Sequence, residues 1–220
     1  MKKLKYIFLL AGALSLASCE SWLDEDPQYT INTKTQFSTV ENARQALMGC
    51  YGYMSADNAY GQAWQEVTFG YCGFGWSQTN GSSTDLLVSM DGGIDETINT
   101  MAWRGMYKVI GETNAFIANI ADSPLESADK LPMEAAARFL RALAYYNLAV
   151  TYGDVPLKTT PSAHDGVAVP RSPKNEVFEL VRTDWEFAYE NLPEKDDDGF
   201  ATKWAAKAYL GKLYHTLGCQ

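Results

Sequence analysis

The chain has 220 residues and a formal net charge of −9, because 27 acidic residues stand against 18 lysines and arginines. This balance argues against a nucleic-acid-binding protein, which needs basic patches to meet phosphates. Hydrophobic residues make up 46% of the chain, enough for a buried core, and aromatic residues reach 13%. Such an aromatic excess is typical of a binding surface or of a tightly filled helical core.

The first residues predict export and lipid anchoring. Three lysines within the first five residues precede an apolar run over residues 6–17, which is typical of a secretory signal. This run is too short to span a bilayer as a helix. The sequence L-A-S-C ending at Cys19 fits a bacterial lipobox, in which the cysteine thiol takes a diacylglycerol. We therefore predict a signal peptide over residues 1–18 and lipidation of Cys19; an ordinary cleaved signal peptide is the alternative.

The residues after Cys19 predict an extended tether over 19–37. Loss of residues 1–18, which carry three lysines and no acid, changes the formal charge from −9 to −12. The acidic run Asp24-Glu25-Asp26 resembles the export tag of surface lipoproteins. A simple solvated tether is the alternative interpretation of these acids.

Apolar residues at helical spacing predict a mainly helical fold. The segment 132–152 is apolar almost all round, apart from a narrow polar stripe of Glu134, Arg138 and Arg141, so it is expected to be buried on several sides. The motifs L-G-x2-Y at Leu210 and A-x3-F at Ala135 favour tetratricopeptide-like repeats. We expect helices over about 38–54, 97–121, 132–152, 172–191 and from 202 onward, with Ser38 and Ser172 as N-caps.

Residues 55–95 interrupt the helical pattern and predict an irregular, aromatic-rich loop. The sequence G-Y-C-G-F-G-W ending at Trp76 holds three glycines, which oppose a long regular element. Aromatic rings cover the CH faces of sugars, and Asn or Asp side chains bond sugar hydroxyls. These rings could instead pack the loop onto the helices. The candidate ligand-binding residues are Trp64, Tyr71, Phe74, Trp76, Asn80 and Asp85.

The remaining chemistry-bearing residues do not predict a catalytic or metal site. His164 and His215 lie in no catalytic pattern. The acidic turn at 194–199 has the spacing of part of a calcium loop but lacks the glutamate that such a loop needs at its last position. The cysteines lack zinc-site spacing, and a Cys50–Cys72 disulfide is left open by the sequence. We expect a protein that is not an enzyme and that uses no cofactor or metal.

The sequence ARFLRALAYYNLAVTYGDVPL over 137–157 resembles the signature segment of the SusD/RagB family of nutrient-binding outer-membrane lipoproteins. T-x-x-N-A-R-Q-A-L from Thr39, W-R-G-M-Y-K-V-I-G-E-T-N from Trp103 and the lipobox fit the same family. The resemblance implies a tetratricopeptide-like scaffold bearing an irregular binding surface.

The resemblance also implies a function and a cellular location. Family members sit at the cell surface on the outer membrane and capture glycans or other nutrients for a SusC-like TonB-dependent transporter. Two other classes stay open: a lipid-anchored helical scaffold that binds only protein, and, with less support, a surface glycan hydrolase that uses two carboxylates.

The resemblance finally implies that the chain is an incomplete member of its family. Residues 38–220 would be the N-terminal helical domain of a longer, truncated protein. The helix that starts near residue 202 would lack a partner helix. Trp204, Tyr209 and Leu213 are then expected to have an uncovered apolar side.

Overall fold

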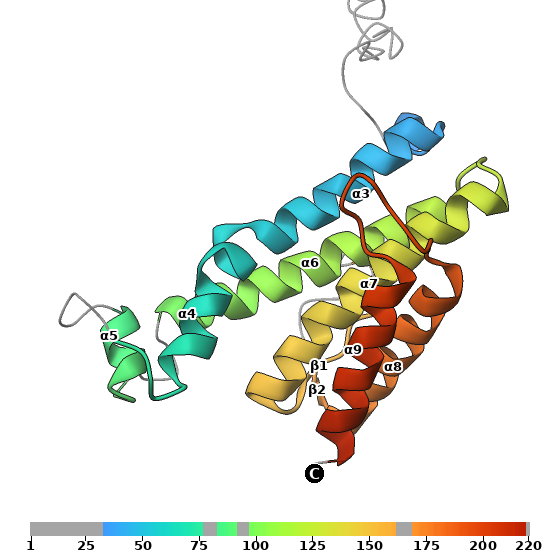
Figure 1. Ribbon diagram of the computed structural model, residues 1–220. Coiled ribbons are helices and arrows are strands. Elements are labelled where there is room, and N and C mark those ends of the chain that lie inside the picture. The colour runs from blue at the N-terminus through green and yellow to red at the C-terminus, as the bar shows by residue number, and fades with distance from the viewer. Residues whose placement is uncertain (1–32, 77–82, 92–96, 162–168, 219–220) are drawn as a thin grey trace, which may run out of the picture. The chain divides into compact units, whose positions relative to one another are not determined.

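The computed structural model describes residues 33–76, 83–91, 97–161 and 169–218 (Figure 1). The predicted signal peptide, Cys19 and most of the predicted tether lie outside these residues, as does Asn80. The predicted extended tether is wrong for its last residues, because Thr33–Gln36 form a helical turn and Phe37 is buried against Phe116. The fold is mainly helical, as predicted, and within the described residues no helix is both long enough and apolar enough to cross a bilayer. The elements in chain order are α2 (Thr33–Gln36), α3 (Val40–Ser55), the π-helical turn η2 (Asp57–Gly61), α4 (Ala63–Gly70), α5 (Ser83–Val88), α6 (Thr97–Ala121), α7 (Ser127–Tyr152), β1 (Val155–Pro156), β2 (Arg171–Ser172), α8 (Lys174–Asn191) and α9 (Lys203–Gly218).

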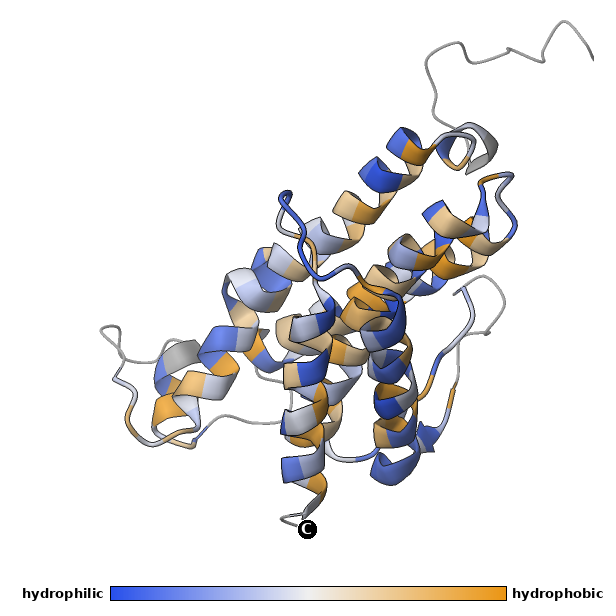
Figure 2. Cartoon of the chain, turned by 45° about the vertical axis from the view of Figure 1, so that its right-hand side comes forward, coloured by the Kyte–Doolittle hydropathy of each residue, from blue (hydrophilic) through white to orange (hydrophobic). Residues whose placement is uncertain are grey.

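The long helices pack as neighbours in chain order. α6 packs on α7, α7 on α8 and α8 on α9, while α3 lies against α6 (Figure 1). The helices carry polar and apolar residues on different faces (Figure 2), and α7 contributes the largest share of the core, since most of its residues from Met133 to Ala149 are buried. The apolar pattern of this segment therefore correctly predicted burial on several sides.

The helix starts differ from their predicted caps. α3 is capped by Thr39, whose Oγ1 accepts a hydrogen bond from the Asn42 amide at 3.2 Å, while the Ser38 hydroxyl donates to the Thr35 carbonyl instead. The predicted Ser38 cap is thus wrong by one residue. α8 begins at Lys174, whose amide donates to Oδ1 of Asp154 at 2.9 Å. The N-cap residue is Pro173, not Ser172, and it makes no side-chain capping bond, so the first helical amide is bonded by a residue 20 positions earlier in the chain.

α7 begins at Ser127, five residues before the expected start, and holds Pro132 inside it. Proline in a helix removes one backbone hydrogen bond, so local sequence favoured a start at Pro132. The longer helix is supported by Lys130, whose Nζ donates to the carbonyls of Ala121 and Ser123 at the end of α6. A cation at the C-terminal end of a helix is favourable, and this contact ties the start of α7 to α6.

The acidic turn between α8 and α9 makes specific contacts within itself and with α3. Asp196 accepts hydrogen bonds from the amides of Asp198 (2.9 Å) and Phe200 (3.1 Å). Arg44 of α3 forms ion pairs with Asp196 at 3.4 Å and Asp198 at 2.5 Å, and its guanidinium lies 4.4 Å from the centre of the Phe200 ring. These contacts hold the turn against α3, far away in the sequence.

α9 is better covered than expected. Leu213 is fully buried, and the Tyr209 ring contacts Phe139 and Trp185, with centroid distances of 5.5 and 5.2 Å. Only Trp204 of the three expected residues stays largely open, with 51% of its surface exposed. The expectation of an uncovered apolar side was wrong for Tyr209 and Leu213, because α7 and α8 supply the rings that cover them.

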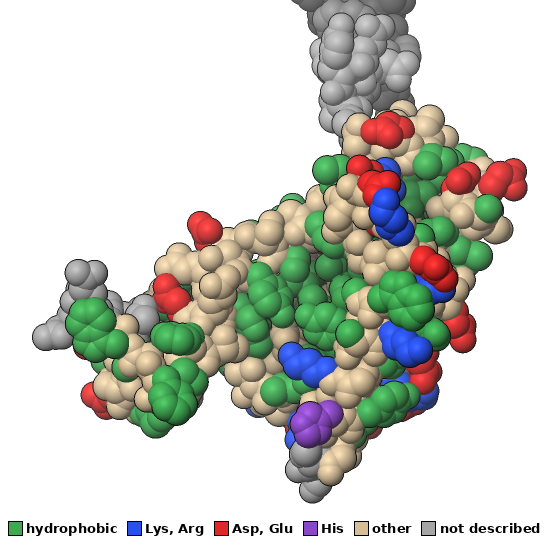
Figure 3. Space-filling model, in the orientation of Figure 1, with side chains coloured by type: hydrophobic (Ala, Val, Ile, Leu, Met, Phe, Trp, Pro, Cys, Tyr) green, Lys and Arg blue, Asp and Glu red, His purple; other side chains and the backbone are tan. Residues whose placement is uncertain are grey.

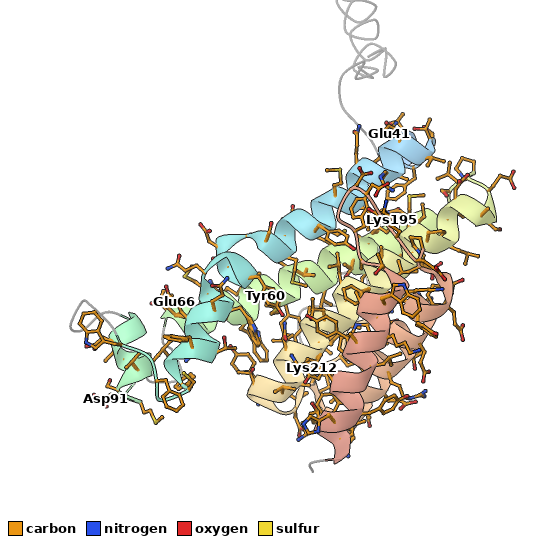
Figure 4. All side chains as sticks on the ribbon, viewed as in Figure 1. Glu41, Tyr60, Glu66, Asp91, Lys195 and Lys212 are labelled. Carbon is orange, nitrogen blue, oxygen red and sulfur yellow. The ribbon has the colours of Figure 1, made fainter. Side chains whose placement is uncertain are left out.

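Two further side-chain findings concern α3 and its neighbours. Cys50 is a buried free thiol and Cys72 an exposed one, so the Cys50–Cys72 disulfide left open by the sequence is not formed. Tyr60 of η2 points toward α7 (Figure 4), where Asn147 Nδ2 donates to its hydroxyl at 2.7 Å. This hydrogen bond connects the start of the aromatic-rich region to the central helix.

Candidate functional site

The segment Phe69–Trp76, called here the aromatic segment, presents large rings to solvent. Phe74 is 91% exposed and Trp76 is 80% exposed, while Phe69 and Tyr71 are also exposed. Figure 3 shows hydrophobic side chains gathered over α4 and α5, the elements that flank this segment. Because exposed apolar groups that gather in one place mark interaction surfaces, the aromatic segment is a candidate binding surface.

Two glycines explain how the aromatic segment is built. At Gly70, a Cβ atom would lie 2.8 Å from the Cβ of Leu87, so glycine allows α5 to approach α4 closely. Gly73 has a φ angle of +76°, a left-handed conformation that side chains disfavour. The prediction that residues 55–95 form an irregular loop is therefore wrong in part. They form η2, α4 and α5, and the chain turns sharply between α4 and Phe74.

The structure separates the predicted ligand-binding residues. Trp64 is only 6% exposed and belongs to the core with Val67, on the buried side of α4. It is removed from the candidate surface, because an indole packed in the core cannot present a face to a ligand. Asp85 lies in the first turn of α5 and is half-buried. Tyr71, Phe74 and Trp76 stay at the surface, and Asn80 is outside the described residues.

A row of side chains on α6 continues from the aromatic segment and was missed in the sequence. Asn99 Nδ2 donates to the Tyr71 hydroxyl at 3.0 Å. Trp103 and Tyr107 follow at intervals of four residues, so all three lie on one side of the helix. The Trp103 ring lies 5.0 Å from that of Tyr107 and 5.1 Å from that of Tyr152. The W-x3-Y spacing was the signal that could have revealed this row.

The row leads into a groove of about 270 Å³ between α6 and the β1–β2 ribbon. Trp103, Tyr107, Gly111 and Asn114 line it from α6. The ribbon side contributes Pro156, Lys158 and Val169. β1 and β2 run antiparallel, with Pro156 opposite Arg171, so residues distant in sequence close one side of the groove.

Hydrogen bonds hold the walls of the groove together. The Tyr107 hydroxyl donates to the Pro156 carbonyl at 2.7 Å, and Asn114 Nδ2 donates to the Lys158 carbonyl at 3.0 Å. The Tyr145 hydroxyl bonds both the carbonyl and the amide of Lys158, at 2.8 and 2.6 Å. Burial raises the pKa of Tyr107 well above its usual value, so its hydroxyl stays protonated and keeps donating.

The buried ion pair between Arg141 and Asp184 holds the Asn114 side chain in place. Arg141 donates through Nε and Nη2 to the two carboxylate oxygens of Asp184, each at 2.8 Å, and through Nη1 to Asn114 Oδ1 at 2.8 Å. The sequence placed Arg141 in a polar stripe, but it is 5% exposed and Asp184 is 0% exposed. The network joins α6, α7 and α8, and it fixes the orientation of the amide in the groove wall.

The two surfaces suit binding by stacking and hydrogen bonding. The aromatic segment offers open rings, and the groove combines rings with amide and amine groups, a composition typical of small-molecule sites. Among the residues that the structure describes, no group of three or more His, Cys, Asp or Glu side chains could hold a metal ion.

The paired antiparallel helices and the exposed aromatic surface define a tetratricopeptide-like helical scaffold that carries a binding surface. Residues 21–215 match the SusD-like family described as "Starch-binding associating with outer membrane". The chain therefore belongs to the SusD-like family, which confirms the resemblance found in the sequence.

Relatives with known names agree with this assignment. SusD-like protein P25 of Formosa agariphila is 26% identical over 95% of this chain and 42% of its own length. A SusD-like protein of Bacteroides ovatus is 28% identical over 96% of this chain and 39% of its own length. The chain thus spans less than half the length of these curated relatives.

Solved structures show the same fold. A laminarin-binding SusD-like protein has a TM-score of 0.70 at 25% identity, covering 82% of this chain and 41% of that one. A structure with xylogluco-oligosaccharide has a TM-score of 0.69 at 26% identity, covering 78% of this chain and 34% of that one. The helical scaffold predicted from the sequence is confirmed by these similarities.

Proposed function

We propose that this protein captures glycans at the cell surface through its aromatic segment and passes them to a SusC-like TonB-dependent outer-membrane transporter. The observation that carries the proposal is the exposure of Phe74 and Trp76, at 91% and 80%, beside a turn set by Gly73. The similarity to structures described with laminarin and xylogluco-oligosaccharide supports a sugar ligand.

The physical argument rests on the match between rings and sugars. A pyranose presents a flat face of CH groups, which stacks on an aromatic ring. Its hydroxyls need hydrogen-bond partners, and Asn99 beside Tyr71 offers an amide at the edge of the aromatic segment. Asp85 and Asn80 are further polar candidates in the same part of the sequence. We propose binding without catalysis, since the surface offers rings and amides to a ligand.

The family assignment supports the proposed location. We propose that residues 1–18 are a lipoprotein signal peptide, that Cys19 carries the lipid in the outer membrane, and that the part of residues 19–37 before Thr33 forms the tether. Residues 38–220 would be the helical part that this chain shares with its longer relatives. Two or more acyl chains would anchor the protein stably, where one alone would be marginal.

A glycan array followed by isothermal titration tests the proposal. The arrays should include laminarin- and xyloglucan-derived oligosaccharides. Phe74→Ala and Trp76→Ala are each expected to weaken binding several-fold, since a lost ring contact is worth about 1 kcal/mol. Trp204→Ala is the matched control, because this tryptophan is also exposed, at 51%, but lies on α9.

Three results would overturn the proposal in different ways. Unchanged glycan affinity in both Phe74→Ala and Trp76→Ala, with helicity kept, would show that these rings do not bind the ligand. Co-purification of an outer-membrane barrel without any glycan affinity would favour the protein-binding scaffold. Release of shortened sugars would favour the hydrolase.

A further inference from the structure

We propose that the groove between α6 and the β1–β2 ribbon binds one anionic sugar residue, a pyranose that carries a carboxylate or a sulfate. The inference rests on the proposed function and specifies its substrate class. It is carried by a pair of cationic side chains, Lys158 and Arg171, beside the aromatic wall formed by Trp103 and Tyr107.

Lys158 lines the groove, and the ribbon places Arg171 beside it. Residues opposite each other in an antiparallel pair project to the same face. Pro156, Lys158 and Val169 line the groove, and Arg171 stands opposite Pro156. Arg171 therefore belongs to the same face of the ribbon. Its charge also acts on the Tyr107 hydroxyl, where it opposes the rise in pKa caused by burial.

Among the residues that the structure describes, neither cation has a carboxylate partner. The side chains of Lys158 and Arg171 make no ion pair, hydrogen bond or ring contact with any part of the chain that the structure describes. By contrast, Arg44, Arg141 and Arg182 each pair with one or more carboxylates. In a chain with a formal charge of −9, cations that no described carboxylate pairs are available to an anionic ligand, and an arginine can bind such a group with two hydrogen bonds.

The size of the groove fits one ring. Its volume of about 270 Å³ lies just below the range of roughly 300–1,000 Å³ that drug-sized ligands occupy. The half-buried faces of Trp103 and Tyr107 supply the stacking wall, and Gly111 leaves the helix side of the groove without a side chain.

The same helix, α6, lines the groove and contacts the aromatic segment. Asn99 touches Tyr71 of that segment, and Gly111 of the groove lies twelve residues further along the same helix, about 18 Å away at 1.5 Å per residue. A glycan several residues long can therefore stack on the aromatic segment while one acidic residue enters the groove.

Titration calorimetry on the full chain tests the inference with three kinds of probe: neutral oligosaccharides, uronate-containing oligosaccharides and sulfated oligosaccharides. The wild type should bind one anionic kind more tightly than the neutral kind, and this preference should shrink as salt rises. The double variant Lys158→Gln, Arg171→Gln should lose about ten-fold or more of the anionic affinity and none of the neutral affinity. Lys195→Gln, on the exposed α8–α9 turn, is the control for loss of a surface charge away from the groove.

A second variant tests the location without changing charge. Val169→Trp places a large side chain in the groove from a residue that lies outside the helices, and should abolish the anionic preference. Equal affinity of the wild type for neutral and anionic probes, or full anionic affinity in the double variant, would overturn the inference while leaving neutral glycan capture standing. Inorganic sulfate that binds as tightly as the sulfated sugar would also overturn it, by showing an anion site that does not recognise sugar. Failure of every glycan to bind would overturn the proposed function as well.

Discussion

The ion pair between Arg141 and Asp184 gives the sharpest test of how the scaffold is held together. Asp184 is 0% exposed, and Arg141 is its closest partner through two hydrogen bonds of 2.8 Å. Asp184→Ala would leave the guanidinium buried with Asn114 as its remaining partner. Removing one member of a buried pair costs about 3–5 kcal/mol, because the other charge stays desolvated and uncompensated.

Replacing Arg141 should lower the free energy of unfolding less than replacing Asp184. Arg138 lies 3.5 Å from Asp184 and keeps contact with solvent. After Arg141→Met, Arg138 can still partner the carboxylate, so we expect a loss of about 2–3 kcal/mol, below the range for a fully orphaned charge. The double variant should cost clearly less than the sum of the two single changes, since no buried charge remains unmatched.

Urea unfolding followed by tryptophan fluorescence measures these free energies. Trp185 follows Asp184 in α8 and is fully buried, so its emission reports on this part of the core. A total stability of about 5–15 kcal/mol is usual for a domain, so Asp184→Ala should shift the urea midpoint strongly. Lys108→Met, which breaks the exposed pair with Glu112, is the control and should cost less than about 1 kcal/mol. Additive single and double variants, or an Asp184→Ala protein as stable as the control, would refute the reasoning.

Two further predictions concern other parts of the chain. Burial by itself would raise the pKa of Asp196, but the amides of Phe200 and Asp198 and the Arg44 guanidinium outweigh it and lower that pKa. The ionised carboxylate therefore stabilises the folded protein above the unfolded pKa near 4. This stabilisation is lost as the pH falls through the lower folded pKa. Melting temperatures measured from pH 5 to pH 2 should thus fall more in the wild type than in Asp196→Asn, and parallel curves would contradict this. Cys19→Ala should abolish palmitate labelling and leave the protein unprocessed or released, whereas equal label in the variant would exclude lipidation at Cys19.

The sequence by itself determined the helical scaffold and the family. Apolar residues at helical spacing predicted α6 with its observed ends, Thr97 and Ala121, because a long pattern with a period of 3.6 residues is specific for a helix with one buried face. The segment 137–157 pointed to the SusD-like family, and it forms most of the central helix α7 and the first strand of the ribbon. The glycines around Phe74 correctly indicated that no long regular element continues there, and α4 ends at Gly70.

Only the tertiary structure decided which side chains face a ligand. Trp64 and Trp76 lie twelve residues apart in one aromatic-rich stretch, yet the first is buried and the second exposed, because α4 packs one of its sides on α6. Arg138 and Arg141 looked alike in the sequence, but only Arg141 is buried, where it donates two hydrogen bonds to a carboxylate 43 residues further along the chain. The groove exists because Pro156 pairs with Arg171 across 15 residues. Burial and hydrogen-bond partners depend on segments that meet only after folding, so no local pattern could have assigned them.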